Sequence, residues 1–380
     1  MTRMRILHLV TCSQRRGAEI VALELARQLD AVGHEDRVVA LGPAFDGSVE
    51  AELPPLVRRS NVAIFRSLRM RRALRRELVL RPVDVLLAHG GRPFEIAVRA
   101  RRRRKPLVVW QRILPFPTAM WRPARRIWWR RLARAGDGAV VLTSDLASEL
   151  RRLGFRGPIW EIQNFRDSAP FADLDRGAAT RVLRAEIGIE PTASVIGLVG
   201  HLIEQKRPER ALEVLAEVHR HGVPAHLVIA GDGPLRERFE RDAAVRGLGA
   251  FVHLLGDRRD VDVVLGGIDV LVSTSVAEGV PGVLIEALMA GCPVVAMRVG
   301  GVATVVEDGV TGMLVDPGDV AAMAERVTEL LRDAPLREQL GAAGRRRSDD
   351  FSARRAAHVY AASFEGLLGG TEPRSTVAPN

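Results

Sequence analysis

The chain has 380 residues, 47% of them hydrophobic and 27% charged, and a formal net charge of +10. This length favours two domains with separate cores, and two distant cysteines, Cys12 and Cys292, argue for a reducing compartment and against a disulfide framework or zinc site. The first residues are too briefly apolar for a signal peptide, and no stretch approaches the roughly 20 apolar residues that span a bilayer, so a cytoplasmic protein is expected.

Short runs of Val, Ile and Leu alternate with helical patterns through the first half of the chain. The expected strands are Arg5–Thr11, Arg37–Leu41, Val83–His89, Leu107–Arg112, Gly138–Thr143 and Ile159–Ile162. The expected helices include Ala18–Val32, Met70–Leu80, Pro93–Arg102 and Trp121–Arg134. This alternation predicts a parallel sheet with helices on both faces, so residues 1–165 are expected to form a Rossmann-like domain.

Two residues at strand ends in this half are candidates for a binding site. Gly17 follows the first strand, where it would let the backbone approach a phosphate at the next helix N-terminus; the alternative is a plain tight turn. His89 ends the third strand before two glycines, so its ring would reach a ligand hydroxyl. The alternative for His89 is a hydrogen-bonded, partly buried histidine.

The basic residues are concentrated in the first half. Residues 1–170 carry 33 Lys and Arg against 16 Asp and Glu, a net +17, whereas residues 171–380 carry 23 against 30, a net −7. The basic run Arg99–Lys105 is followed by four of the five tryptophans, between Trp110 and Trp129. This mixture favours peripheral contact with an anionic surface such as the inner membrane face. The alternatives are a solvated Arg-rich face, an acceptor groove, a nucleotide-stacking surface or ordinary helix packing, and no nucleic-acid-binding module is recognised.

The alternation restarts after a polar segment, Asn164–Gly177, which is expected to be a linker. The expected strands are Val195–Val199, Ala225–Ala230, Phe251–Leu255, Ile268–Ser273, Pro293–Met297 and Gly312–Val315, and the expected helices include Pro208–His221, Leu235–Arg246 and Gly282–Ala290. Residues 166–348 are therefore expected to form a second Rossmann-like domain. Residues 349–368 have an amphipathic helical pattern, and residues 369–380 are expected to be a disordered tail.

Two carboxylates, Glu278 and Glu286, flank a Gly/Pro turn that is expected to open a helix. Pro281 suits the first helical turn, where the N–H groups of residues 282–284 would be unpaired at the positive end of the helix dipole. A phosphate fits such a position. Since a carboxylate beside a phosphate is repulsive, both are expected to accept hydrogen bonds from sugar hydroxyls. The segment predicts a site for a nucleotide sugar.

The loop Gly200–Lys206 follows another strand and holds one of only two lysines in the chain. A lone lysine at a strand-end loop predicts a point charge on a diphosphate, with a chance surface lysine as the alternative. The turn at residues 231–234 is interpreted as structural. Two Asp-X-Asp pairs, at residues 173–175 and 260–262, have a spacing found at metal sites, but neither clearly ends a strand that faces the proposed site, so no metal is expected.

Together these segments resemble family 4 of the retaining glycosyltransferases, which have the two-domain GT-B architecture. The resemblance runs from RILHLVT to SARRAAHVYAASFEGLL and is strongest in EGVPGVLIEALMAGCPVVA, which carries the Glu–seven residues–Glu motif. RRGAE resembles the first-loop signature, and NFRDSAPF resembles the interdomain segment, with Phe165-Arg166 in place of the usual Gly-Val. GHLIEQK resembles the phosphate-binding loop, with His201 where Arg is usual.

The resemblance implies two Rossmann-like domains facing each other across a cleft, a final helix that crosses back to the N-terminal domain, and metal-independent transfer of a hexosyl-type sugar. A nucleotide-diphosphate sugar is the expected co-substrate, with no other cofactor. It implies that His89, Lys206 and Glu278 are catalytic. The donor-binding residues are expected to be Gly17, His201, Lys206, Leu255, Glu278, Gly279, Val280, Pro281, Gly282, Val283 and Glu286.

The sequence does not distinguish among possible acceptors of the sugar. A glycolipid or other lipid-linked saccharide, a polysaccharide precursor and a small metabolite such as an aminocyclitol are all compatible with it. Other readings are a sugar-nucleotide epimerase, which would need no acceptor, and a phosphorylase, which would depend on inorganic phosphate. A non-enzymatic protein that binds an anionic surface is a third.

Overall fold

The structure is a computed structural model that describes residues 3–13, 17–43, 53, 55–56, 63–102, 105–113, 116 and 121–370. Its contacts divide the chain into two units: unit 1 is Met1–Phe165 with Ala353–Asn380, and unit 2 is Arg166–Ser352. Most of the predicted tail, from residue 371 onward, lies outside the described residues.

Unit 1 contains a six-stranded parallel sheet with the strand order β2-β1-β3-β4-β5-β6. The strands are β1 Arg5–Cys12, β2 Glu35–Gly42, β3 Val85–His89, β4 Leu107–Arg112, β5 Gly138–Val141 and β6 Ile159–Glu161. The central strands β3 and β5 are buried along their whole length, which explains why the sequence shows continuous apolar runs there.

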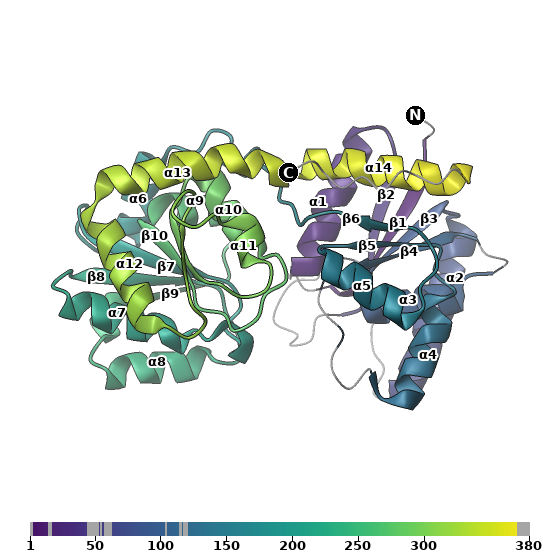
Figure 1. The fold of residues 1–380 in the computed structure, drawn as a ribbon, viewed down its shortest axis with the longest axis horizontal. Coiled ribbons are helices and arrows are strands. Elements are labelled where there is room, and N and C mark those ends of the chain that lie inside the picture. The colour runs from purple at the N-terminus through teal and green to yellow at the C-terminus, as the bar shows by residue number, and fades with distance from the viewer. Residues whose placement is uncertain are drawn as a thin grey trace. The chain divides into compact units, whose positions relative to one another are not determined.

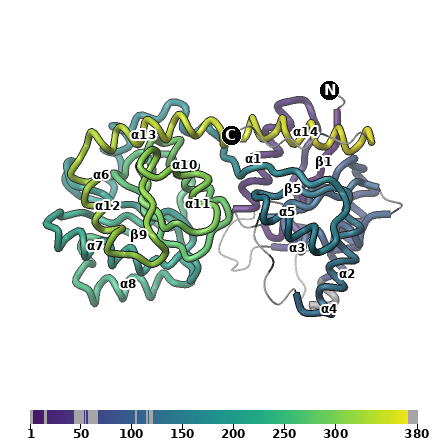
Figure 2. Tube along the Cα trace, viewed as in Figure 1, coloured from purple at the N-terminus to yellow at the C-terminus, as the bar shows by residue number. Residues whose placement is uncertain are grey.

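Helices cover both faces of this sheet (Figure 1). They are α1 Gly17–Ala31, α2 Ala63–Leu80, α3 Gly91–Ala100, α4 Pro123–Ala133, α5 Ser144–Leu153 and α14 Ala353–Gly369. The last helix packs beside α1, so the first and last helices of the chain lie side by side on one face of the sheet (Figure 2). Tyr360 and Phe364 of α14 are fully buried in a cluster with Ile6, Leu25 and Leu87. Burying a large apolar side chain contributes about 1.5–3 kcal/mol, so α14 is part of the core of unit 1.

Unit 2 contains a second six-stranded parallel sheet, with the order β12-β11-β10-β7-β8-β9. The strands are β7 Ser194–Val199, β8 Ala225–Ala230, β9 Val252–Gly256, β10 Val270–Ser273, β11 Val294–Met297 and β12 Met313–Val315. The helices are α6 Arg176–Ile187, α7 Glu209–Arg220, α8 Arg236–Val245, α9 Val261–Gly267, α10 Gly282–Ala290, α11 Val302–Val305, α12 Val320–Arg332 and α13 Ala334–Ser348. Helices α6, α9, α10 and α13 group on one face, and α7 and α12 on the other (Figure 1).

Several element boundaries differ from expectation. The helix predicted from Met70 begins at Ala63, and the one predicted from residue 349 begins at Ala353 after a short 3₁₀ turn. The strand predicted to reach Thr143 ends at Val141, because Thr143 is the N-cap of α5 and its Oγ1 accepts a hydrogen bond from the Leu146 N–H at 3.4 Å.

Candidate active site

Glu278 lies in the loop after β10 and is held from two sides. Its Oε1 accepts a hydrogen bond from the Ser275 Oγ at 2.6 Å and contacts the Lys206 Nζ at 2.5 Å. The Glu278 side chain is only 8% exposed, against 25% for Lys206. The two residues predicted to bind the donor sugar and its diphosphate are thus in direct contact, as adjacent groups of one ligand require.

The loop that carries Lys206 is fixed to the loop after β10, and the two strands from which these loops emerge are neighbours in the sheet. The Thr274 Oγ1 donates to the carbonyls of Lys206 and Arg207 at 2.8 and 3.1 Å, and the Val276 N–H donates to the Gln205 carbonyl at 3.0 Å. Arg207 has φ 48°, a left-handed conformation that is strained for a non-glycine residue. These bonds hold Lys206 in one place despite that strain.

The loop after β11 packs against the Glu278 loop with no space for a side chain between them. A Cβ on Gly300, which has φ +51°, would lie 1.8 Å from the Glu278 carbonyl oxygen, and the Gly301 N–H donates to the Gly279 carbonyl at 2.7 Å. Glycine is needed at residue 300 for both its backbone conformation and its space. Three strand-end loops therefore share one rigid arrangement.

Helix α10 begins at Gly282, and Pro281 is its N-cap rather than a residue of its first turn. One of the three N–H groups predicted to be unpaired is bonded: the Leu284 N–H donates to the Pro281 carbonyl at 3.2 Å, because the helix opens with a 3₁₀-type bond. No side chain caps the helix. The positive end of the α10 dipole therefore has no side-chain acceptor among the described residues, and Gly282 at its start is buried.

Glu286 of α10 is held by an arginine from the segment that begins unit 2. The Arg166 Nε donates to the Glu286 Oε1 at 2.7 Å, and the two side chains are 6% and 17% exposed. The guanidinium also covers Gly282, since a Cβ there would lie 1.5 Å from its Nη2. Glu286 is thus oriented at the start of α10 before any ligand binds.

Three other predicted donor-binding residues form no hydrogen bond or ion pair with Lys206, Glu278 or Glu286 in the part of the chain that the structure describes. His201 lies in the loop after β7 and is partly exposed. Leu255 is on β9, separated from β10 by β7 and β8, which corresponds to about 14 Å across the sheet. Gly17 is the first residue of α1 in unit 1, and residues 14–16 before it lie outside the described residues. Their roles stay predictions.

His89 is 2% exposed and belongs to a buried polar row that crosses four strands of unit 1. The His8 Nδ1 lies 3.1 Å from the His89 Nε2, and the His8 Nε2 lies 2.8 Å from the Asp36 Oδ1. On the other side, Gln111 is the register partner of His89, and its Nε2 lies 2.9 Å from the Tyr360 hydroxyl of α14. Burial and His8 lower the pKa of His89 well below its usual value, and a hydrogen bond with Gln111 opposes this. His89 is thus held neutral inside the sheet, and its predicted contact with a substrate stays a prediction.

The acidic pairs with metal-like spacing have structural contacts. The Asp175 carboxylate accepts hydrogen bonds from the N–H groups of Gly177 and Ala178 as the N-cap of α6. Asp260 forms a two-pronged ion pair with Arg258, at 2.8 and 2.6 Å. The turn at residues 231–234 also packs tightly, because a Cβ on Gly231 would lie 2.1 Å from the Gly200 carbonyl oxygen.

The sequence did not indicate four of these contacts. Ser275 had no distinguishing signal except that it lies two residues after Ser273, the last residue of the expected strand. Arg166 was visible as a departure from the family segment, although its partner was not. His8 and Asp36 lie inside expected or adjoining strands, where a polar residue in an apolar run is the signal of a buried network.

Unit 2 therefore brings two ion pairs, Lys206 with Glu278 and Arg166 with Glu286, and the start of α10 to the carboxyl edge of its sheet. Open α/β sheets bind ligands at that edge. The cation and helix suit a phosphate, and the carboxylates suit hydroxyl groups.

Two family models match the chain. "Glycosyltransferase Family 4" matches residues 15–169, and "Glycosyl transferases group 1" matches residues 180–347. Among curated relatives, the alpha-D-kanosaminyltransferase of Streptomyces kanamyceticus is 30% identical over 285 residues, 72% of this chain and 73% of the relative. The 2-deoxystreptamine glucosyltransferase of the same organism is 31% identical over 291 residues, 73% of this chain and 72% of the relative.

Solved structures with the same fold include the Anabaena protein HepE in complex with UDP-glucose, with a TM-score of 0.79, 19% identity and coverage of 96% of this chain and 100% of that one. The lipopolysaccharide glycosyltransferase WaaG has a TM-score of 0.71 and 19% identity, with 95% of this chain and 100% of that one covered. At these sequence identities the structural similarity shows the fold alone, and this is the GT-B fold that the sequence predicts.

Proposed function

This chain belongs to glycosyltransferase family 4, and from that premise we propose that it transfers a hexosyl-type sugar from a nucleoside-diphosphate sugar to an acceptor hydroxyl, with retention of configuration and without a metal ion. The contact of Lys206 with Glu278 carries the proposal, because the cation expected to bind the diphosphate lies beside the carboxylate expected to bind the sugar. Glu286, oriented by Arg166, would accept hydrogen bonds from the ribose hydroxyls.

The proposed chemistry requires stabilisation of a leaving diphosphate. As the bond between the anomeric carbon and the phosphate oxygen breaks, negative charge grows on the diphosphate, and Lys206 with the N–H groups at the start of α10 would stabilise it. The acceptor oxygen then bonds to the anomeric carbon from the same face. Its proton passes to the leaving phosphate oxygen, so the products are a glycoside and a nucleoside diphosphate.

A UDP-sugar donor is supported by the HepE complexes with UDP and UDP-glucose. An aminocyclitol acceptor is supported by the 2-deoxystreptamine glucosyltransferase, which is covered over 72% of its length. Relatives from lipopolysaccharide core biosynthesis, 29–30% identical over 54–56% of this chain, support a lipid-linked saccharide as the second acceptor.

The test is a donor and acceptor panel with mass spectrometry of the products. Purified protein with UDP-glucose and 2-deoxystreptamine is expected to release UDP and form an α-glucoside, without loss of rate in a chelator. Release of no nucleoside diphosphate from any donor, together with no donor binding by calorimetry, would refute the proposal. A β-linked product would refute retention alone.

We also propose that α4 contacts an anionic membrane surface. Apart from Leu132 and Ala133, this helix buries none of its residues, and it carries Ile127 and Trp128 at 57% and 38% exposure among its arginines. Exposed apolar and cationic side chains on one helix suit a lipid interface. No helix of the described residues is long and apolar enough to cross a membrane. Flotation with anionic vesicles, compared between wild type and Trp128→Ser, tests this; equal flotation would refute it.

A further inference from the structure

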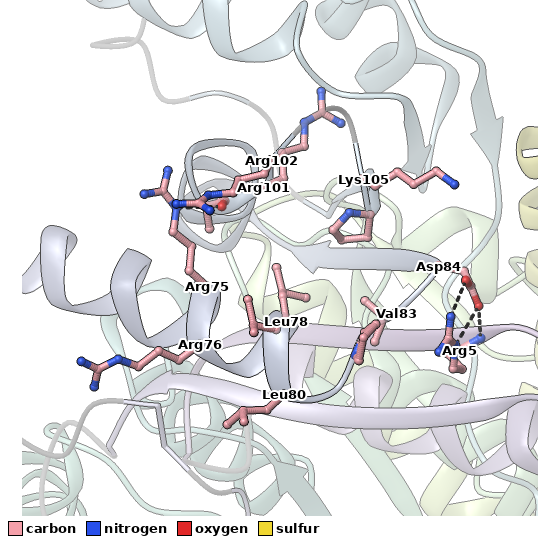
Figure 3. A pocket seen from close by; sticks show the side chains of 14 residues that line it. Arg5, Arg75, Arg76, Leu78, Leu80, Val83, Asp84, Arg101, Arg102 and Lys105 are labelled. Atoms are coloured by element: carbon pink, nitrogen blue, oxygen red, sulfur yellow. Dashed lines mark hydrogen bonds and ion pairs between the residues drawn. The ribbon is translucent and has the colours of Figure 1, made fainter.

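The cations around the cavity of unit 1 do not converge on one point (Figure 3). This cavity, of about 710 Å³, lies at the amino ends of the strands, and Figure 3 shows Arg76, Arg102 and Lys105 pointing in different directions from its wall. The carboxylate in its lining, Asp84, is bound by the Arg5 guanidinium at 3.1 and 3.3 Å. The charged groups of the candidate donor site in unit 2 are arranged differently, because they lie in direct contact with one another.

In the structure, Lys206 is occupied by Glu278. The Glu278 Oε1 contacts the Lys206 Nζ at 2.5 Å and accepts a hydrogen bond from the Ser275 Oγ at 2.6 Å, and in the described part of the chain no hydrogen bond reaches its Oε2. A diphosphate that binds Lys206 therefore competes with Glu278 for the ammonium. Sharing the ammonium would keep the carboxylate against the diphosphate, and like charges at that distance repel.

The exposure of the two side chains indicates which of them moves. Lys206 is 25% exposed and has a flexible four-carbon stem, whereas Glu278 is only 8% exposed. The backbones on both sides are fixed, because the Thr274 Oγ1 donates to the Lys206 carbonyl at 2.8 Å and the Gln205 Nε2 donates to the Ala277 carbonyl at 2.7 Å. The ammonium can therefore change partners while the two loops stay in place.

Ser275 remains with Glu278 when the ammonium leaves. This serine is 2% exposed, and its hydroxyl donates to the same oxygen atom, Oε1, that contacts the lysine. A largely buried carboxylate that loses every donor is costly, so one retained hydrogen bond matters. With Oε1 held by the serine, Oε2 is left to accept a hydrogen bond from a sugar hydroxyl.

We propose that donor binding moves Lys206 from Glu278 to the diphosphate, and that Ser275 is the positioning residue that then holds Glu278 for the sugar. The inference rests on the proposed function, which assigns the lysine to the diphosphate and the glutamate to the sugar. A bare nucleoside diphosphate breaks the ion pair and supplies no hydroxyl to the carboxylate, whereas a complete sugar nucleotide supplies one. The ion pair thus favours the whole donor over the nucleoside diphosphate that the reaction releases.

Calorimetry with UDP and UDP-glucose on the full chain tests the exchange. Glu278→Gln is expected to bind UDP about fivefold more tightly than wild type, because Lys206 has lost its competing partner. Ser275→Ala is expected to bind UDP about tenfold more weakly, because the carboxylate is left without a donor when the ammonium leaves. In the Glu278→Gln background the same serine substitution is expected to have no effect on UDP affinity, since no carboxylate remains to be held.

Two further variants make the result specific. Ser348→Ala is the matched control, because Ser348 is a buried serine of unit 2 whose Oγ donates to the Arg345 carbonyl at 2.8 Å, and its UDP affinity is expected to match wild type. Lys206→Met separates exchange from simple repulsion between Glu278 and the diphosphate. In that background Glu278→Gln is expected to give no gain in UDP affinity, because there is no ammonium to release.

The outcomes separate this inference from the proposed function. UDP affinity that is unchanged or weaker in Glu278→Gln, or an equal gain with and without Lys206, would overturn the exchange and leave the transferase proposal intact. An equal loss from Ser275→Ala in both Glu278 backgrounds would make the serine merely structural and overturn its role. Wild-type protein that bound neither UDP nor UDP-glucose would refute the UDP-sugar donor of the proposed function, and the exchange with it.

Discussion

The pair Arg166–Glu286 gives a prediction that separates stability from ligand binding. In Arg166→Leu the Glu286 carboxylate, 17% exposed, loses its ion-pair partner. Removing one partner of a buried pair costs about 3–5 kcal/mol, and since Glu286 keeps some access to water we expect the lower end, about 3 kcal/mol, in the free energy of unfolding. The freed carboxylate also loses the orientation in which we propose it binds the ribose, so donor binding is expected to weaken by about 1.5–3 kcal/mol, or roughly 10- to 150-fold in affinity.

The double variant Arg166→Leu/Glu286→Gln is decisive. The double variant leaves no unpaired charge. Its loss in the free energy of unfolding, measured in urea, is therefore expected to be about 1.5–3 kcal/mol smaller than the sum of the losses in the two single variants. Nucleoside-diphosphate binding by calorimetry is expected to stay weak, because the amide oxygen that replaces the Glu286 carboxylate is an uncharged, weaker acceptor for the ribose hydroxyls and has no arginine to orient it. Additive effects on stability, or donor affinity restored in the double variant, would refute the assignment of Arg166 as the residue that positions Glu286.

Arg184→Leu is the control. Arg184 pairs with Asp269 at 2.8 Å in the same unit, with side chains 5% and 21% exposed, which closely matches the Arg166 pair. Asp269 precedes β10 at the amino edge of the sheet, whereas Glu286 follows its carboxyl end. The control is therefore expected to lose a similar stability while it keeps wild-type donor affinity. A comparable loss of donor affinity in Arg184→Leu would show that general destabilisation explains both results.

Further outcomes follow from the same structure. Lys206→Ala is expected to lower kcat about 10²–10³-fold in a donor-consumption assay, since the cation proposed to stabilise the negative charge of the leaving diphosphate is lost; an unchanged kcat would exclude that role. Gly300→Ala is expected to raise the donor KM, because the new Cβ would push the Glu278 loop aside. Gly309 is also at positive φ but has nothing within 4 Å of its Cβ position, so Gly309→Ala is expected to destabilise the fold without a change in KM. Equal KM values for the two variants would contradict this. Tyr360→Phe is expected to cost about 1–2 kcal/mol in urea unfolding, because the buried Gln111 side chain loses a partner; a neutral effect would mean that this bond contributes nothing. Burial and His8 lower the pKa of His89, so below about pH 6.5 this side chain binds a proton in the unfolded chain but not in the folded one. The free energy of unfolding is therefore expected to fall by up to about 1.4 kcal/mol for each pH unit below about 6.5. His89→Gln is expected to flatten this pH dependence, and an unchanged slope would contradict the reasoning.

The sheet strands could be predicted because parallel strands buried on both faces leave uninterrupted apolar runs in the sequence. The ends of strands could not be predicted as closely where the apolar run continues past the last strand residue. Leu142 and Thr143 extend an apolar, β-branched run, yet Thr143 caps α5, and only its hydrogen bond shows where the strand stops. The start of α2 at Ala63 likewise lay beyond the pattern used to predict it.

In the candidate site too, some residues could be predicted from the sequence whereas their long-range contacts could not. Glu278, Glu286 and Lys206 could be named because each lies at or near a strand end with a turn signal, and the contact between Lys206 and Glu278 agrees with adjacent roles on one ligand. Arg166 could not be paired with Glu286, because 120 residues separate them and no local pattern encodes which long-range polar groups meet. The same holds for His89, whose neighbours His8 and Gln111 come from different strands.

The last helix has a consequence for how the chain is made. Tyr360 bonds to Gln111, and Phe364 lies in a cluster with the first strand, so the interior of unit 1 is incomplete until residues 353–364 have been synthesised. All of unit 2 is translated in between. At about 5–20 residues per second, the ribosome needs roughly 10–40 s for that stretch. During this interval the first half of the protein exposes apolar surface that α14 will later cover. Unit 2, which is continuous in sequence, can finish folding first, and a chain that stops before Ala353 is expected to need a chaperone or to aggregate.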